Sequence, residues 1–126
     1  MEINVIDVGC RYGIHPTWEG IPLMNYYGFD ADSKEIVRLK KKYKKKSSNY
    51  KFFPIGISDK EGTSKFYTYH HEGQSSYFYP NKKSVWFSGI RTEESQITKT
   101  NMIATTTIDS FCNLNKIKRV DFIKAD

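Results

Sequence analysis

Residues 5–13 read Val-Ile-Asp-Val-Gly-Cys-Arg-Tyr-Gly, an apolar strand pattern that runs directly into a loop containing two glycines. Residues 28–32 read Gly-Phe-Asp-Ala-Asp and end a second strand pattern. In an α/β sheet, glycines in such a loop let the backbone approach a ligand, and an acid after the next strand accepts hydrogen bonds from ribose hydroxyls. The two segments together predict a site for a ligand that contains a nucleoside.

The glycine spacing narrows the choice of ligand. Gly9-x-x-x-Gly13 differs from the Gly-x-Gly-x-x-Gly pattern that places a pyrophosphate at a helix N-terminus. A ligand with a ribose and no phosphate fits this loop better, which makes S-adenosyl-L-methionine the first candidate. An oxidoreductase that binds a dinucleotide is the less favoured alternative.

The composition predicts one globular domain. Of 126 residues, 38% are hydrophobic and 15% aromatic, enough for a substantial core. The longest apolar runs fall short of the roughly 18 residues of a membrane span.

The two cysteines, Cys10 and Cys112, form no disulfide framework, and we therefore expect a cytoplasmic protein. The Cys and His spacings do not resemble a zinc site, so no metal is expected, and no catalytic residue can be assigned.

The net charge of +6 is concentrated in residues 40–46, Lys-Lys-Lys-Tyr-Lys-Lys-Lys. One interpretation is a non-catalytic basic module that contacts nucleic acid or another anionic surface. The other is the solvated end of a helix, where cations interact favourably with the helix dipole. We favour the second, and do not expect nucleic acid as a partner, because the run follows a capping-box pattern at Asp32 and Glu35.

Strand and helix patterns alternate along the chain. The helix expected at 14–24 is short and irregular, because Pro16, Gly20 and Pro22 interrupt it. A strand at 102–107 is expected to pair with one at 64–69. The alternation predicts a parallel sheet with right-handed crossovers. The expected strands are 3–8, 26–30, 50–55, 64–69, 102–107 and 120–125, and the remaining helices are 33–46, 92–97 and 109–113.

These motifs, in this order, resemble the FkbM-type family of S-adenosylmethionine-dependent methyltransferases. The resemblance implies an α/β, Rossmann-like class I methyltransferase fold with a parallel sheet flanked by helices. It also implies methyl transfer to a hydroxyl of a sugar or small natural product, so the expected partner is a small-molecule or glycan acceptor. Family members usually carry Glu-Pro where this chain has Asp30-Ala31, which leaves the carboxylate on a shorter stem. The motifs that carry the resemblance are residues 7–13, Pro16, Trp18 and residues 28–32, 56–62, 106–109 and 121–126.

The resemblance also implies roles for individual residues. Asp30 is expected to accept hydrogen bonds from the ribose hydroxyls. Asp59 either accepts from the adenine amine, with Ile57 against the ring, or is a turn residue. Asp7 either faces the methionine part of the cofactor or bonds the amides of the glycine loop. The full set of expected cofactor-binding residues is Asp7, Gly9, Cys10, Gly13, Asp30, Ala31, Ile57, Ser58, Asp59 and Asp126.

The family pattern continues past position 126 with a Val-Glu-Gly segment, a helix and further strands. The resemblance therefore implies that residues 1–126 form a partial methyltransferase domain, the cofactor-binding half, truncated after the fourth core strand. Such a fragment of a methyltransferase can lack activity by itself. In that case the strand at 120–126 is an unprotected sheet edge. We expect the chain to self-associate through it.

Overall fold

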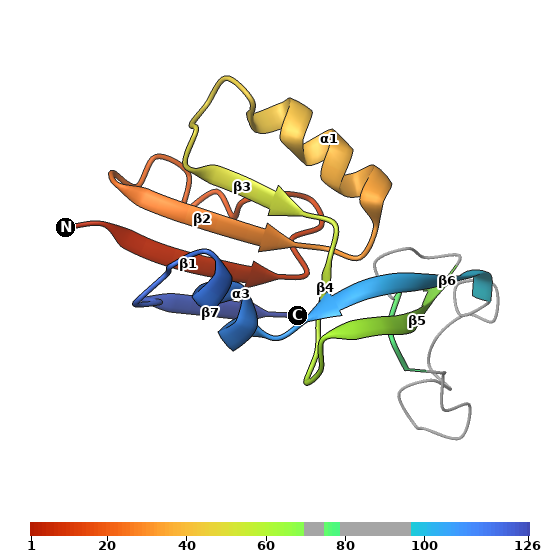
Figure 1. Cartoon of the computed structure of the whole chain (residues 1–126). Coiled ribbons are helices and arrows are strands. Elements are labelled where there is room, and N and C mark those ends of the chain that lie inside the picture. Colours follow the sequence, from red (N-terminus) through yellow and green to blue (C-terminus); the bar gives the residue numbers. More distant parts are fainter. Residues whose placement is uncertain (70–74, 79–96) are drawn as a thin grey trace, which may run out of the picture. The chain divides into compact units, whose positions relative to one another are not determined.

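Four parallel strands form the main sheet, in the order β3-β2-β1-β7. The computed structural model describes residues 1–69, 75–78 and 97–126. Because the strands are parallel, their carboxyl ends all lie along the same side of the sheet, which we call its carboxyl edge (Figure 1). The predicted parallel α/β sheet is confirmed. Its strands are β1 (Ile3–Val8), β2 (Met24–Phe29), β3 (Tyr50–Phe53) and β7 (Phe122–Ala125).

Helix α1 (Ser33–Tyr43) covers one face of this sheet (Figure 1). Its buried residues Ile36, Leu39 and Tyr43 recur at helical spacing and pack against Val5 and Tyr26 of the sheet. The helix was expected to reach residue 46 but ends at Tyr43. After Tyr43 the chain forms a tighter turn. In it the Lys46 N–H donates to the carbonyl three residues earlier, that of Tyr43, at 3.0 Å.

Helix α3 (Ile108–Leu114) confirms the short helix expected at 109–113, and it covers the other face of the sheet. Thr107 caps it by accepting a hydrogen bond from the Ser110 N–H at 3.0 Å. Phe111 is the anchor of the helix, and its ring meets those of Phe29 and Phe53 edge-on at centroid distances of 4.7 and 5.0 Å. Such contacts add about 1 kcal/mol each to the apolar area they bury.

Three further strands form a second sheet, in the order β4-β6-β5. The strands expected at 64–69 and 102–107 correspond to β5 and β6. These two strands are neighbours in the second sheet, so the expected pairing is confirmed. The chain forms two compact units, residues 1–62 with 104–126, and residues 63–103; the candidate site belongs to the first. The helix expected at 92–97 falls outside the described residues, apart from Ile97, which begins β6. The strands are β4 (Gly56–Ile57), β5 (Gly62–Tyr69) and β6 (Ile97–Thr106).

The helix expected at 14–24 is absent from this fully described segment, which consists of turns. The N–H of Trp18 donates to the His15 carbonyl at 2.8 Å and the N–H of Ile21 to the Trp18 carbonyl at 3.2 Å, so isolated turns follow one another. Gly20 and Leu23 have φ of 85° and 58°, in the left-handed region. Proline and left-handed residues break the helical ladder here, and the prediction was wrong.

Strand β7 is the last strand of the main sheet in the described part of the chain. Its side chains Phe122 and Ile123 are 52% and 47% exposed. Self-association through this strand stays a prediction.

Asp32 is the N-cap of α1, and its replacement tests the capping assignment. Its Oδ1 accepts from the N–H groups of Lys34 and Glu35 at 3.0 and 3.3 Å, and Oδ2 pairs with Arg11. Asp32→Ala should lower the free energy of unfolding by between about 1 and 2 kcal/mol in urea denaturation. The neighbouring Ser33→Ala is the control, and equal losses in the two variants would contradict the assignment.

Candidate functional site

The glycine loop, residues 9–13, turns sharply at the end of β1. The N–H groups of Gly9 and Cys10 both donate to the Phe29 carbonyl, at 2.8 and 3.0 Å, which fixes the loop against the end of β2. Gly9 and Gly13 have φ of 82° and 100°, a conformation that favours glycine. The two glycines predicted to shape the loop therefore do so.

The Cys10 side chain points into the core and away from solvent. It is 1% exposed, and a Cβ added at Gly28 would lie 3.0 Å from its sulfur, so the glycine in β2 makes room for it. Burial, followed by the negative charges of Asp30 and Asp7, raises the pKa of the Cys10 thiol well above its ordinary value. The thiol stays protonated, and only backbone atoms of Cys10 are available to a ligand.

Tyr43 of α1 supports the far end of the glycine loop. Its hydroxyl accepts from the Ile14 N–H and donates to the Glu19 carboxylate, both at 3.1 Å. A Cβ added at Gly13 would lie 2.5 Å from that hydroxyl oxygen. Tyr43 falls within the helix expected at 33–46, but this role was missed. The signal was the hydroxyl itself, since a buried tyrosine needs a hydrogen-bond partner.

The exposed side of the loop is connected to the first turn of α1. The Arg11 guanidinium forms an ion pair with Asp32, and the Tyr12 N–H donates to Glu35 at 3.2 Å. Hydrogen bonds from Arg38 and then from the Tyr12 N–H hold the pKa of Glu35 below its usual value. The loop is thus braced from two sides, by the start of α1 and by Tyr43 at its end.

Asp30 follows β2 and lies beside this loop. Its N–H donates to the Phe53 carbonyl at 3.2 Å, and its Oδ1 accepts from the Asp32 N–H at 2.8 Å. Burial raises the pKa of the Asp30 carboxyl, while the Asp32 N–H and the Arg11 charge act in the opposite direction. Oδ2 of Asp30 accepts no hydrogen bond from the described residues, so a partly buried acceptor is available to a ligand.

Asp7 is almost completely buried, with 2% of its surface exposed. Its Oδ2 accepts from the Tyr26 hydroxyl at 2.6 Å and its Oδ1 from the Lys124 ammonium at 3.0 Å. Of the loop amides expected as alternative partners, those of Gly9 and Cys10 donate to the Phe29 carbonyl, and that of Gly13 donates to the Cys10 carbonyl. The Tyr12 amide donates to Glu35. Both carboxylate oxygens of Asp7 are therefore already bonded within the protein.

Lys124 and Asp126 bring the end of β7 to the same place. Lys124 stands opposite Asp7 in the β1–β7 register, and its ammonium also bonds the Asp126 carboxylate. Burial lowers the pKa of Lys124, but the bonds to Asp126 and Asp7 outweigh it, and the pKa lies above its ordinary value. The Asp126 N–H donates to the Val8 carbonyl at 3.1 Å. Lys124 was missed by sequence analysis, because its register against Asp7 is not visible in the sequence.

Of the remaining predicted site residues, Ala31 follows β2, Ile57 ends β4, and Ser58 and Asp59 follow β4. Ala31 is partly buried beside Asp30. Ile57 packs with the cluster around Phe29 and Phe111, and the Ser58 N–H donates to the Thr106 carbonyl at 2.9 Å. The Ser58 hydroxyl donates to the exposed Asp59 carboxylate at 3.1 Å. Both interpretations of Asp59, adenine contact and turn residue, are compatible with this position.

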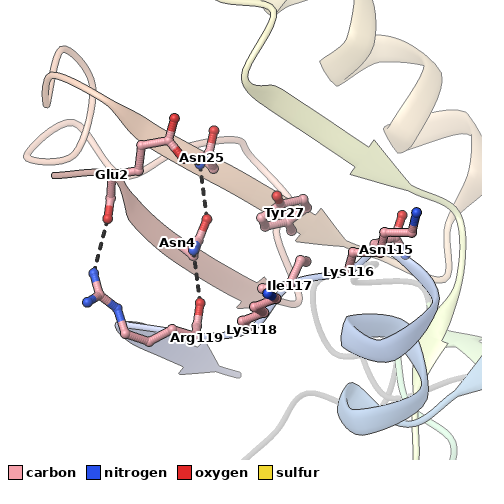
Figure 2. Close-up of a pocket in the computed structure, with 9 residues that line it drawn as sticks. All are labelled: Glu2, Asn4, Asn25, Tyr27, Asn115, Lys116, Ile117, Lys118 and Arg119. Atoms are coloured by element: carbon pink, nitrogen blue, oxygen red, sulfur yellow. Dashed lines mark hydrogen bonds between the residues drawn. The ribbon is translucent and has the colours of Figure 1, made fainter.

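An open cavity of about 380 Å³ lies at the other end of the strands (Figure 2). Asn25 donates to Asn4 at 3.0 Å and Asn4 donates to the Arg119 carbonyl at 2.9 Å along its floor. Ligands of parallel α/β sheets bind beyond the carboxyl ends of the strands, whereas this cavity is at the amino ends. None of the predicted site residues lines it. Its lining is Glu2, Asn4, Asn25, Tyr27, Asn115, Lys116, Ile117, Lys118 and Arg119.

The six lysines of residues 40–46 are all exposed. Lys46 pairs with Glu19 at 3.0 Å. Tyr43, the aromatic residue within the run, is buried and 2% exposed. Over the ranges 1–69, 75–78 and 97–126, no helix is long and apolar enough to cross a membrane, and no His, Cys, Asp and Glu side chains gather as a metal would require.

A parallel sheet flanked by helices, with a glycine loop after its first strand and an acid after the second, defines a Rossmann-like α/β fold. The model of the methyltransferase FkbM domain family matches residues 9–126. The chain belongs to this family, as its motifs indicated. No curated protein and no solved structure matches the chain significantly.

Gly13 and Gly20 form a matched pair that isolates the contact with Tyr43. Both have positive φ, 100° and 85°, but a Cβ at Gly20 would meet nothing within 4 Å. Gly20→Ala should cost only the left-handed strain of about 1–2 kcal/mol. Gly13→Ala adds the collision with the Tyr43 hydroxyl and should cost clearly more in urea denaturation. Similar losses in the two variants would show that Tyr43 does not hold the loop.

Proposed function

We propose that this FkbM-family chain binds S-adenosyl-L-methionine at the carboxyl edge of the main sheet, for methyl transfer to a hydroxyl of a sugar or small natural product. Family membership supports the methyltransferase class. The observation that carries the cofactor site is Asp30, whose Oδ2 accepts no hydrogen bond within the described chain and lies beside a glycine loop fixed to the same strand end.

The residues present fit the nucleoside part of this cofactor. Two ribose hydroxyls donating to an ionised carboxylate form charge-assisted hydrogen bonds, each worth about 1.5–3 kcal/mol. Partial burial of Asp30 strengthens such bonds, because little water competes for its oxygens. Gly9 and Gly13 add no side chain to the loop, so a ligand can approach the backbone there.

When bound, S-adenosyl-L-methionine supplies a methyl group activated by its sulfonium. The contribution of the protein is to hold donor and acceptor in line and to exclude water, so positioning dominates the catalytic effect. The braced loop and Asp30 perform that task for the donor. The acceptor hydroxyl also needs a group that takes its proton, and the described residues assign none.

The lysine run supports a second function less well. Its six exposed ammonium groups are compatible with a basic module that contacts an anionic surface. Binding of single-stranded nucleic acid uses aromatic side chains on which bases stack, whereas Tyr43 is buried in the core. The helix-end interpretation explains the same lysines without a partner.

Replacing Asp30 tests the proposed function. Asp30→Ala should weaken binding of S-adenosylhomocysteine at least about tenfold in isothermal titration, because both ribose bonds lose their acceptor. Asp30→Asn, which keeps one acceptor oxygen without the charge, should fall between Asp30→Ala and the wild-type chain. Glu2→Ala removes a carboxylate at the opposite end of the strands and should leave the affinity unchanged. Absence of binding heat for the folded wild-type chain would overturn the proposal.

A further inference from the structure

The cavity at the amino ends of the strands is lined by cations that the function proposed above does not use (Figure 2). Its volume of about 380 Å³ lies within the range of about 300–1,000 Å³ that is usual for small-molecule sites. Lys116 and Lys118 line it and are exposed, and their ammonium groups form no hydrogen bond or ion pair with the described residues. The guanidinium of Arg119, in contrast, is paired with Asp121 at 2.8 Å. Two cations are therefore available to a ligand.

The wall that carries these lysines is fixed to β1. The Asn4 side chain donates to the Arg119 carbonyl at 2.9 Å, and the Arg119 guanidinium donates to the Glu2 carbonyl at 3.2 Å (Figure 2). The Asn4 N–H donates to the Asp121 carboxylate at 2.9 Å, and the Asp121 N–H donates to the Asn4 carbonyl at 2.9 Å. A ligand would meet a preformed wall, so little free energy would be lost in ordering it.

Lys116 occupies a backbone position that glycine normally fills. Helix α3 ends in a Schellman motif, in which the Ile117 N–H donates to the Cys112 carbonyl at 2.9 Å. The Lys116 N–H donates to the Asn113 carbonyl at 3.3 Å, and Lys116 has a φ of 57°, in the left-handed region. The helix dipole favours a cation anywhere in the last turn, so it does not account for a lysine at this strained position. Strain retained beside a cavity points to a function of the side chain.

Neutral polar groups line the cavity together with the lysines. Asn25 donates to Asn4 at 3.0 Å, and its Oδ1 accepts no hydrogen bond from the described residues. The Asn115 amide donates to the Phe111 carbonyl at 2.9 Å, and its Oδ1 likewise has no donor among them. Burial raises the pKa of the Tyr27 hydroxyl, which stays a neutral donor. Amide oxygens accept hydrogen bonds from hydroxyls, so this lining suits a hydroxylated ligand.

We propose that this cavity is a second ligand site, which binds the phosphate monoester of a hydroxylated small molecule. The ammonium groups of Lys116 and Lys118 bind the phosphate, since charge-assisted hydrogen bonds are the strong ones. The amide oxygens of Asn25 and Asn115 accept from the hydroxyls. The Glu2 carboxylate in the same lining is outnumbered by the lysines and is a further acceptor for a hydroxyl. This site is independent of the one proposed at the carboxyl edge.

Three probes test the inference in isothermal titration at fixed ionic strength: glucose 6-phosphate, inorganic phosphate and glucose. Glucose 6-phosphate should bind, inorganic phosphate should bind more weakly, and glucose should give no measurable heat. Lys118→Met should weaken binding of glucose 6-phosphate at least about fivefold, because one charged contact to the phosphate is lost. Lys40→Met, in the exposed lysine run, changes the net charge equally and should leave the affinity unchanged.

Lys116→Gly separates binding from folding. Glycine adopts the left-handed conformation without strain, so the midpoint of urea denaturation should rise. The affinity for glucose 6-phosphate should nevertheless fall at least about fivefold, a combination that a loss of stability cannot produce. Binding of S-adenosylhomocysteine should equal that of the wild-type chain, because its proposed site is at the other end of the strands.

Absence of binding of glucose 6-phosphate by the folded wild-type chain would overturn the inference. Equal affinities for glucose 6-phosphate and inorganic phosphate would also overturn it, because they would show an adventitious ion only. Equal losses in Lys40→Met and Lys118→Met would show attraction by the general charge of the protein and not a site in the cavity. All three results would leave the proposed function intact, since titration with S-adenosylhomocysteine tests it separately.

Discussion

The Phe29 carbonyl accepts hydrogen bonds from both Gly9 and Cys10, and the candidate site depends on this interaction. It joins the end of β1 to the end of β2, and Asp30 is the residue that follows Phe29. The acid and the glycine loop are therefore placed together by the backbone, before any side chain contributes. The left-handed conformations of Gly9 and Gly13 make this close approach feasible.

Charges at the carboxyl edge are arranged in pairs around this backbone frame. Arg11 pairs with Asp32 at the start of α1, and Lys124 pairs with Asp7 and Asp126 at the end of β7. Asp30 differs from the other acids, because its bonds leave one oxygen available while burial raises its pKa. Binding of hydroxyl donors would relieve the cost of burying that charge.

The sequence predicted those features that depend on local patterns. The capping box at Asp32 and Glu35 located α1, and apolar runs located the strands of the parallel sheet. The glycine loop and Asp30 were recognised because they are contiguous motifs. The prediction of a helix at 14–24 was wrong. The left-handed backbone conformation of a residue such as Leu23 cannot be inferred from its residue type.

Long-range pairing accounts for what sequence analysis missed. The contact of Lys124 with Asp7 joins residues 117 positions apart and requires the β1–β7 register. The Tyr43 hydroxyl reaches the N–H of Ile14, the residue after the glycine loop, only because α1 packs across β1 and β2. Neither contact leaves a periodic signal in the sequence, so a structure was needed to find them.

Amide chemical shifts during titration with S-adenosylhomocysteine test the central claim most directly, because they report both ends of the sheet at once. The account predicts changes at residues 9–13 and 30–32, with residues 115–119 of the amino-terminal cavity unaffected. Changes confined to residues 115–119, or none at the glycine loop at saturating ligand, would contradict it.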